Sequence, residues 1–488
     1  MTGGQVAAVD VGATSGRVML ADVGRDRLAM RPVARFPNEP VRLWNGRRSA
    51  LHWDIAGLFG HICKGLAAAG RTADDLCGVG VDSWAVDYGL LRDGRLLSTP
   101  HHYRDARTER GVELVHDRIS PAELYQRNGL QFLPFNTVYQ LAVERAEGVL
   151  DLADTVLLIP DLINYWLTGQ PAAERTNAST TGLLGLDGGW DRDLMARLGI
   201  GDHLFGDLVE PGSVRGPLLA DIASALGIAA GTEVVSAASH DTASAVAATP
   251  MRSEDAAYIS CGTWGLVGVE LPEAVATAEA RAANFTNEVG ADGRVRFLHN
   301  VMGMWLLSET VRQYEREGRP ADLSTLLAEA AAAPAPVAVF DTDDPRFLPP
   351  GDMPGRIGDW YVDRGLLAPA GPAQMVRAIV ESLAAAFAGT VRAAAELSGT
   401  RVSMVHIVGG GSQNRLLCQL TADRLGLPLL AGPVEATALG NVLLTARARG
   451  LVRGDLEALR ALVVRHFPVR RYVPRDSRAR RAQPVEVG

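Results

Sequence analysis

Lysine is almost missing from this sequence: Lys64 is the only one among 48 basic residues. This scarcity excludes any mechanism that relies on several lysine side chains. Cysteine is also rare, and Cys63, Cys77, Cys261 and Cys418 form neither a Cys-x-x-Cys pair nor a Cys/His cluster with the spacing of metal ligands. A structural zinc site and a disulfide scaffold are therefore both disfavoured.

The sequence also lacks an excess of positive charge and long apolar runs. The net charge of −8 argues against a nucleic-acid partner, which would require a basic face. No apolar run approaches the ~18 residues of a membrane span, and the opening MTGGQVAAVDVG has neither the basic nor the apolar region of a signal peptide. We expect a cytoplasmic protein with no membrane partner.

The length of 488 residues predicts more than one domain, because a single core stops growing at roughly 250–300 residues. The predicted limits are 1–248 for an N-terminal domain, 249–450 for a C-terminal domain and 451–488 for a C-terminal segment. This last segment ends in a basic tail, which we expect to be a solvated terminus. Its arginines are Arg470, Arg471, Arg475, Arg478, Arg480 and Arg481.

Two strand–turn–strand patterns occur, one in each half of the chain. Apolar, β-branched runs at 5–11 and 17–20 flank the turn Gly12–Gly16, and runs at 256–260 and 266–269 flank the turn at 261–265. Their similar layout suggests an internal duplication.

Strands and helices alternate elsewhere, which favours an α/β fold. Strands are predicted at 77–81, 234–238 and 402–408, and helices from Pro160, from Ala243 and over 413–425. A strong helix is predicted from the 3.6-residue spacing of Val376, Ile379, Val380, Leu383, Phe387 and Val391. Residues 331–356 are rich in Ala, Pro, Gly and Asp, which is typical of a long surface connection.

Three glycine-containing turns could bind phosphate or nucleotide. Asp10 precedes Gly12–Arg17, where backbone N–H groups could face phosphates and the carboxylate could hold Mg²⁺ through water. Gly262-Thr263 is the matching turn of the second half, and Gly409–Gly411 separates a strand from a helix. Each turn taken alone could equally be an ordinary tight turn. None has the GxxxxGK[ST] pattern, so a P-loop enzyme is unsupported.

Asp241 follows a predicted strand and opens a predicted helix, which is a suitable position for a general base. A helix N-cap is the alternative role for an aspartate there. We assign neighbouring His240 a positioning role, because no Ser or Cys nucleophile elbow accompanies it. Candidate sugar-binding segments, in which aromatic and hydrogen-bonding residues occur together, are 82–87, 103–105 and 131–136.

Several of these motifs resemble those of the FGGY carbohydrate kinases. The similarity runs from VAAVDVGATSGR at 6–17, through IPDLINYWLTG at 159–169, TNAST at 176–180 and HIVGGGSQN at 406–414, to GPVEATALGN at 432–441. It implies an α/β protein with two actin-like, ribonuclease H-like ATPase domains and a cleft between them. Four further segments resemble the family members that act on L-rhamnulose: 80–91, 126–141, 239–250 and 284–307.

The resemblance implies transfer of the ATP γ-phosphoryl group to O1 of L-rhamnulose, with Asp241 as catalytic base, Mg²⁺ as cofactor near Asp10, and sugar and ATP as the binding partners. It assigns substrate binding to Ala85, His240, Asp241, Thr242 and Asn300. It assigns ATP binding to Ala13, Thr14, Ser15, Gly16, Arg17, Thr263, Ser308 and Gly410.

Two departures from the family pattern affect these assignments. Ala85 stands where the related enzymes have glycine, and its methyl group could narrow the sugar pocket. Ser308 stands where a glutamine contributes to the ATP site. Three alternatives stay open: a kinase for another ketose such as L-fuculose or a pentulose, a non-catalytic sensor of sugar or ATP, and an actin-like ATPase that serves a protein partner.

Overall fold

The computed structural model describes residues 3–252, 254–319 and 322–475. By spatial contacts the chain forms two compact units, each assembled from separate segments. The first unit holds Met1–Arg252, Glu270–Phe297 and Ala436–Phe467, and the second holds Ser253–Val269, Leu298–Glu435 and Pro468–Gly488. The domain limits given above stay a prediction, and the tail arginines beyond residue 475 lie outside the described residues.

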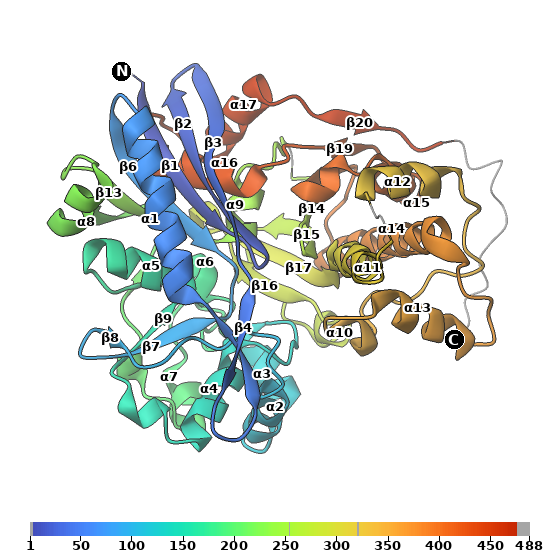
Figure 1. Ribbon diagram of the computed structural model, residues 1–488, viewed down its shortest axis with the longest axis horizontal. Coiled ribbons are helices and arrows are strands. Elements are labelled where there is room, and N and C mark those ends of the chain that lie inside the picture. Colours follow the sequence, from blue (N-terminus) through green and yellow to red (C-terminus); the bar gives the residue numbers. More distant parts are fainter. Residues whose placement is uncertain (1–2, 253, 320–321, 476–488) are drawn as a thin grey trace. The chain divides into compact units, whose positions relative to one another are not determined.

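The first unit is built on a six-stranded sheet with the order β12-β13-β6-β1-β2-β3 (Figure 1). β1 pairs antiparallel with β2 and parallel with β6, which in turn pairs parallel with β13. The hairpin predicted at 5–20 is confirmed, although its second strand begins at Ser15, two residues earlier than predicted. The strands are β1 Gly4–Val11, β2 Ser15–Gly24, β3 Arg27–Pro37, β6 Leu76–Ser83, β12 Ser213–Pro217 and β13 Glu233–His240.

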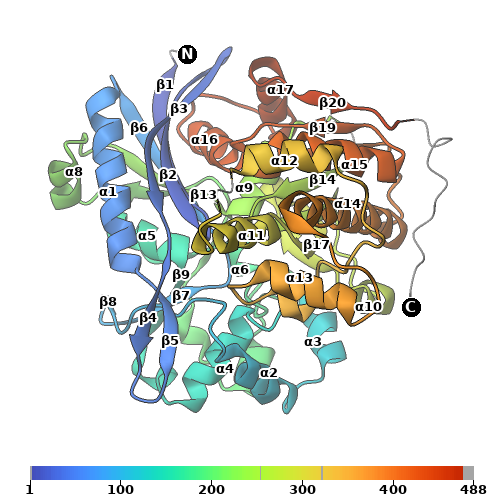
Figure 2. The same cartoon turned by 45° about the vertical axis from the view of Figure 1, so that its right-hand side comes forward.

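Helices cover both faces of this sheet, so the inner strands are buried on both sides. α1, Ile55–Thr72, packs on one face, where Gly65 lies against Val18 of β2. α16, Ala436–Ala448, packs on the opposite face against β1, β6 and β13 (Figures 1 and 2). Side chains alternate between the two faces of a strand, so Asp82 and Gly80 lie on the same face of β6. This is the face that α16 covers.

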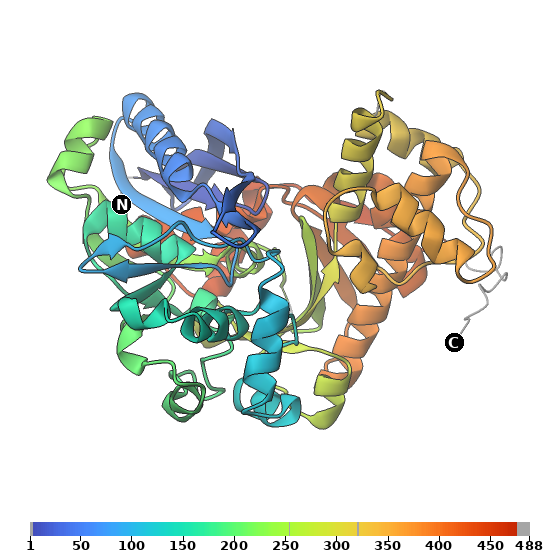
Figure 3. The ribbon, with the colours of Figure 1, turned by 60° about the horizontal axis from the view of Figure 1, so that its bottom comes forward.

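A smaller region of the first unit lies between β6 and β13 in the sequence, where short helices surround the sheet β8-β7-β9. Figure 3 shows this region in cyan to green. Its elements are β7 Tyr88–Arg92, β8 Arg95–Leu96, α2 Thr108–His116, α3 Pro121–Asn128, α4 Thr137–Ala146, β9 Thr155–Leu158, α5 Ile159–Thr168, β10 Ala173–Glu174, α6 Arg175–Ala178, α7 Arg192–Leu198, β11 Leu208–Val209 and α8 Ala220–Leu226. The unit also contains β4 Pro40–Trp44, β5 Ser49–Trp53, α9 Asp241–Ala247, α10 Ala278–Ala282, β16 Thr286–Val289 and α17 Leu456–His466.

The second unit uses the same strand arrangement as the first. Within a sheet of order β16-β17-β15-β14-β18-β19-β20, β14 pairs antiparallel with β15 and parallel with β18. This repeats the pairing of β1 with β2 and β6, and it supports the predicted duplication. The strands are β14 Ala256–Cys261, β15 Trp264–Leu271, β18 Met404–Val408, β19 Leu429–Ala431 and β20 Arg470–Tyr472, together with β17 Val295–Met302, of which residues 295–297 belong to the first unit.

The strong helix predicted around residues 376–391 is α14, Gly371–Ser398, and it forms the centre of the second unit's core. All six apolar positions that predicted it are 0–1% exposed. Within the described residues, α14 is the one helix long and apolar enough to cross a membrane, but most of its apolar stretch is buried inside the protein. The other helices here are α11 Trp305–Arg316, α12 Leu323–Ala332, α13 Met353–Val362 and α15 Arg415–Leu425.

The prediction of a long surface connection over 331–356 is wrong in part. α13 begins at Met353, and Phe340, Thr342 and Phe347 are at most 3% exposed. Phe340 packs against Phe347, with ring centroids 5.2 Å apart, and also against Trp360 of α13. Composition indicated a loop because Ala, Pro and Gly dominate the segment, but a few aromatic side chains anchor it to the core.

Close contact between α9 and α16 depends on Gly440. A Cβ atom at this position would clash with the carbonyl group of Ser244. We predict that Gly440→Ala lowers the free energy of unfolding by about 1–3 kcal/mol, because overpacking forces the backbone to shift. Denaturant unfolding would measure this loss.

Gly389→Ala is the matched control, because Gly389 lies in the interior of helix α14 with no atom near its missing Cβ. This change should raise stability by about 0.5–1 kcal/mol. Equal effects of the two changes would contradict the role given to Gly440.

Candidate active site

Carboxylates gather at the carboxyl end of the first unit's sheet. Asp10 on β1 is the register partner of Asp82 on β6, and His240 on β13 pairs with Ser83. Because β1, β6 and β13 are parallel, their carboxyl ends meet at one edge. Asp241 follows β13 directly, so the structure brings together Asp10 and Asp241, which the sequence indicated separately.

The aspartates at this edge have different partners. Arg17 donates to Asp10 Oδ2 from Nε at 2.8 Å and from Nη2 at 2.6 Å. Asp82 is fully buried, and Asn441 Nδ2 donates to its Oδ2 at 2.6 Å. Burial, followed by the neighbouring charges of Asp10 and Asp241, raises the pKa of Asp82 well above its ordinary value.

This arrangement fits a divalent cation held beside Asp10. Arg17 binds Asp10, while the charges of Asp10 and Asp241 already disfavour the ionised form of buried Asp82. Added positive charge at this edge would offset the repulsion among these groups. The described residues contain no cluster of three His, Cys, Asp or Glu side chains with the geometry of a complete metal cage. Mg²⁺ does not require such a cage, since it keeps several waters and binds substrate phosphates.

Asp241 is the first residue of α9 and does not cap it. His240 occupies the N-cap position, and no side-chain capping bond forms there. The structure therefore contradicts the N-cap alternative for Asp241. Its side chain is 30% exposed, and Thr242 Oγ1 donates to Oδ1 at 3.1 Å. A carboxylate that is accessible but anchored suits proton transfer.

His240 contacts two buried charged residues, Arg296 and Glu288, that were not predicted from the sequence. Its Nε2 lies 3.5 Å from Asp241 Oδ1, while its Nδ1 lies 3.1 Å from Arg296 Nη2 and 3.3 Å from Glu288 Oε2. Both partners lie within the segment 284–307 that carries part of the family resemblance. Charged residues in strands usually face solvent, so nothing in the residue pattern indicated that these two are buried.

Ala85 is placed by a strained loop between β6 and β7. It is the one residue from 80 to 91 that is not buried. The next residue, Val86, has φ of 69°, which is exceptional for a β-branched side chain. Thr137 Oγ1 donates to the Val86 carbonyl at 2.7 Å, and Gln140 Nε2 donates to it at 3.4 Å. These bonds hold the backbone in the conformation that presents Ala85.

Asp87 fixes the other side of this loop. Its Oδ2 accepts from Trp53 Nε1 at 2.6 Å, Trp84 Nε1 at 3.0 Å and the Tyr103 N–H at 3.2 Å, and its Oδ1 accepts from Gln140 at 2.9 Å. Burial raises the pKa of Asp87 to about 6, so the carboxyl is ionised at neutral pH and can accept all these bonds.

The other candidate sugar segments support this loop as well. Asp105 pairs with Arg48 and accepts from the Leu51 N–H at 2.8 Å. Burial alone would raise the pKa of Asp105, but Arg48 and backbone N–H groups lower it to about 2. Asn136 Nδ2 donates to the Gln131 carbonyl at 2.9 Å. The two segments reach the loop through other residues: the Tyr103 N–H donates to Asp87, and Gln140, which binds Asp87, also donates to the Phe135 carbonyl at 2.9 Å.

The turn between β1 and β2 leaves backbone donors available for phosphate. Asn38 fixes it by donating from Nδ2 to the Gly12 carbonyl at 2.9 Å and from its N–H to the Thr14 carbonyl at 3.1 Å. Among the described residues, no hydrogen bond uses the N–H groups of Ala13 or Thr14. Ser15 is exposed, and Gly16 cannot carry a side chain because the Phe36 ring occupies that space.

The predicted ATP-binding residues of the second unit lie on neighbouring turns. Thr263 follows β14, and Gly410 follows β18, the parallel neighbour of β14. Side chains at Gly409 or Gly411 would clash with Cys261, so the glycines let the two turns approach. The Trp305 N–H donates to the Thr263 carbonyl at 3.2 Å, which docks the start of α11 on the first turn.

Two further predicted residues belong to the second unit. Ser308 is exposed on α11, one turn after Met304, whose N–H donates to the Gly262 carbonyl at 3.0 Å. Asn300 is half-buried on β17. The predicted site residues are thus shared between the units: Ala13–Arg17, Ala85 and His240–Thr242 in the first, and Thr263, Asn300, Ser308 and Gly410 in the second.

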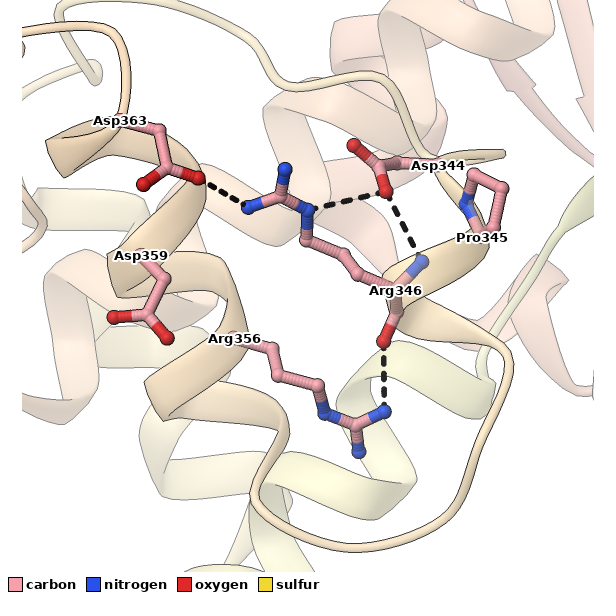
Figure 4. A pocket seen from close by; sticks show the side chains of 6 residues that line it. All are labelled: Asp344, Pro345, Arg346, Arg356, Asp359 and Asp363. Carbon is pink, nitrogen blue, oxygen red and sulfur yellow. Dashed lines mark hydrogen bonds and ion pairs between the residues drawn. The ribbon is translucent and has the colours of Figure 1, made fainter.

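A surface hollow in the second unit is lined by none of these residues (Figure 4). Arg346 donates to Asp344 at 3.1 Å and to Asp363 at 2.9 Å, and Arg356 donates to the Arg346 carbonyl at 2.8 Å. Because the lining holds the three aspartates Asp344, Asp359 and Asp363 against two arginines, the hollow has no excess of positive charge to attract a phosphate.

The sequence is similar to carbohydrate kinases along nearly its whole length. Models of the N-terminal and C-terminal domains of the FGGY family of carbohydrate kinases match residues 5–247 and 257–449. A rhamnulokinase of Pectobacterium carotovorum subsp. carotovorum (strain PC1) is 40% identical over 479 residues, which cover 96% of this chain and 93% of the relative. A rhamnulokinase of Enterococcus faecalis (strain ATCC 700802 / V583) is 39% identical over 470 residues, which cover 95% of this chain and 93% of the relative.

Solved structures of sugar kinases have the same fold. Gluconate kinase from Lactobacillus acidophilus superposes with a TM-score of 0.77 at 18% identity, covering 97% of this chain and 94% of the other. Xylulose kinase from Rhodospirillum rubrum superposes with a TM-score of 0.75 at 23% identity, covering 97% of this chain and 95% of the other. The predicted fold class is confirmed.

The strain at Val86 can be measured. Val86→Gly removes a buried side chain but also relieves the left-handed conformation, which costs a side-chain-bearing residue about 1–2 kcal/mol. Val81→Gly, in neighbouring β6, removes an equally apolar side chain without that relief. We predict that Val86→Gly is less destabilising by about 1–2 kcal/mol in denaturant unfolding. Equal losses would show that the loop is unstrained.

Proposed function

Since the chain belongs to the FGGY family of carbohydrate kinases, it is an ATP-dependent sugar kinase, and we propose that its sugar is L-rhamnulose. The reaction transfers the γ-phosphoryl group of ATP to O1 and yields L-rhamnulose 1-phosphate and ADP. The choice of sugar is supported by the relatives named rhamnulokinase. The observation that supports the chemistry is the accessible carboxylate of Asp241, which lies at the same sheet edge as Asp10 and Arg17.

In this mechanism Asp241 is the general base. As the O1 oxygen attacks the γ-phosphorus, its proton passes to the Asp241 carboxylate and the bond to the ADP oxygen breaks. Phosphoryl transfer proceeds through a loose transition state, so alignment and charge stabilisation account for most of the catalysis. We assign sugar binding to Ala85, His240, Thr242 and Asn300.

We assign the triphosphate to the N–H groups of the β1–β2 turn and to Arg17, and the rest of ATP to the turns of the second unit. These ATP-binding residues are Ala13, Thr14, Ser15, Gly16, Arg17, Thr263, Ser308 and Gly410. The divalent ion that the family uses with ATP is proposed to be Mg²⁺, held near Asp10 through water. When bound, this ion would neutralise charge that develops on the phosphate oxygens.

Both reactants are small metabolites, and we propose that the enzyme works on them in the cytoplasm. Water competes with the sugar for the phosphoryl group, so a sugar kinase must exclude water during transfer. We therefore expect slow ATP hydrolysis when no sugar is present.

Asp241→Asn tests the base directly. Amide nitrogen and oxygen cannot accept the hydroxyl proton, so kcat should fall by roughly 10²–10⁴-fold while sugar binding persists. Coupled ADP-release kinetics would measure kcat, and calorimetry would measure sugar binding. Asp221→Asn, an exposed acidic residue in the first turn of α8, is the matched control. Near-normal kcat in Asp241→Asn would rule out this base.

The sugar is tested by a panel of L-rhamnulose, L-fuculose, L-xylulose, D-xylulose, L-ribulose and glycerol. We expect the highest kcat/KM on L-rhamnulose. Ala85→Gly removes one methyl group from the proposed pocket, and one such group shifts discrimination by only about 1–3 kcal/mol. The variant should therefore change the ranking of larger and smaller ketoses by up to ~200-fold.

A different preferred ketose in the wild type would overturn the choice of sugar and would leave the base and the fold unchanged. The presence of Ala85 favours this alternative more than any other feature. ATP binding without turnover of any acceptor would instead indicate a sensor.

A further inference from the structure

Arg296 and Glu288 form a buried charged pair against one nitrogen of His240. Arg296 Nη2 lies 3.0 Å from Glu288 Oε2 and 3.1 Å from His240 Nδ1. Arg296 is 0% exposed, Glu288 4% and His240 6%. The three come from β17, β16 and β13, and all belong to the first unit.

A buried pair of this kind is an unfavourable way to gain stability. Desolvation of two charges often exceeds their attraction, and apolar replacements of similar volume are frequently as stable. Arg296 Nε does donate to the Val289 carbonyl at 3.1 Å, but Nη1 is buried without a hydrogen-bond partner. A contribution to stability is therefore a weak explanation for the presence of the pair. Its contact with His240 suggests a different role.

The chemistry of arginine determines which imidazole nitrogen carries the proton. A guanidinium is always charged and can only donate. To accept from Arg296, Nδ1 must be unprotonated, and a neutral imidazole then carries its proton on Nε2. Nε2 is the nitrogen that lies 3.5 Å from Asp241 Oδ1. Arg296 thus turns an N–H group of His240 toward the base.

Glu288 keeps this arrangement electrically neutral. Burial alone would raise the pKa of Glu288, but the charge of the Arg296 guanidinium lowers it below its ordinary value. An ionised Glu288 offsets the buried guanidinium. In the opposite tautomer Nδ1–H would face the Arg296 Nη2 donor at 3.1 Å, and the Nε2 lone pair would face the Asp241 carboxylate, so neither nitrogen would match its neighbour.

We propose that Arg296 and Glu288 are positioning residues that hold His240 as the Nε2–H tautomer and thereby orient the catalytic carboxylate of Asp241. His240 Nε2–H and Thr242 Oγ1 both approach Oδ1. Oδ2 is then the oxygen that receives the proton of the sugar hydroxyl. This inference rests on the proposed function of Asp241 as base.

The tautomer itself can be observed without any turnover. In protein labelled with ¹⁵N-histidine, long-range ¹H–¹⁵N correlation spectra distinguish Nε2–H, Nδ1–H and imidazolium forms, and His240→Gln assigns the signal among the ten histidines. We expect the wild type to show the Nε2–H form near neutral pH. A protonated Nδ1 in the wild type would overturn the proposal.

Replacement of the pair should release His240. The double variant Glu288→Leu/Arg296→Met exchanges both charges for apolar groups of similar volume, which preserves folding better than one unpaired charge. We expect a mixture of tautomers and a kcat lowered roughly ten- to hundredfold, part of the 10²–10⁴-fold contribution of a general base. The KM for sugar should change much less, and an unchanged tautomer would refute the positioning role.

Arg296→Lys and Arg294→Met complete the test. Lysine can still donate to Nδ1, so Arg296→Lys should keep the tautomer and recover part of kcat. Arg294 lies just before β17, where it pairs with Glu270. Its replacement by Met should change neither the tautomer of His240 nor kcat. If the tautomer follows these expectations while Asp241→Asn stays active, the positioning is correct and the proposed base is wrong.

Discussion

Three parallel strands that end at one edge are the constraint on which the rest of this structure depends. β1, β6 and β13 bring Asp10, Asp82 and Asp241 to the same place, because parallel strands direct their carboxyl ends alike. Helices must then cover both faces of the sheet, and α16 does so at a separation short enough to require Gly440. The second unit repeats this strand arrangement and carries the predicted ATP-binding turns at the corresponding ends.

Burial of polar groups around this edge is extensive, and it is concentrated where the proposed chemistry occurs. Asp82 is paired with Asn441, Asp87 accepts four N–H donors, and Glu288 is paired with Arg296. Such groups cost free energy unless each is hydrogen-bonded or paired. Their common effect is to fix backbone and side-chain geometry around Ala85, His240 and Asp241, which suits a reaction whose rate depends on alignment.

Much of the candidate site could be predicted from the sequence because its motifs are local. The turn at Gly12–Gly16, the strand that ends at Asp241 and the glycines at 409–411 each follow from a few adjacent residues, and the structure has them at the predicted places. The aromatic anchors of 331–356 were missed because composition indicated a loop. Glu288 and Arg296 were missed for a different reason: which face of a strand a charged residue occupies depends on what packs against it.

The sequence by itself determined the fold class, the family and the residues of greatest chemical interest, because strand and helix periodicity and short motifs are properties of neighbouring residues. Only the tertiary structure decided which of these residues act together. The contacts of His240 with Glu288 and Arg296 join positions 48 and 56 residues apart, and the bond from Asn441 to Asp82 joins positions 359 apart. Contacts over such separations are fixed by strand order and by helix packing across the sheet, and neither can be read from the residues that lie between.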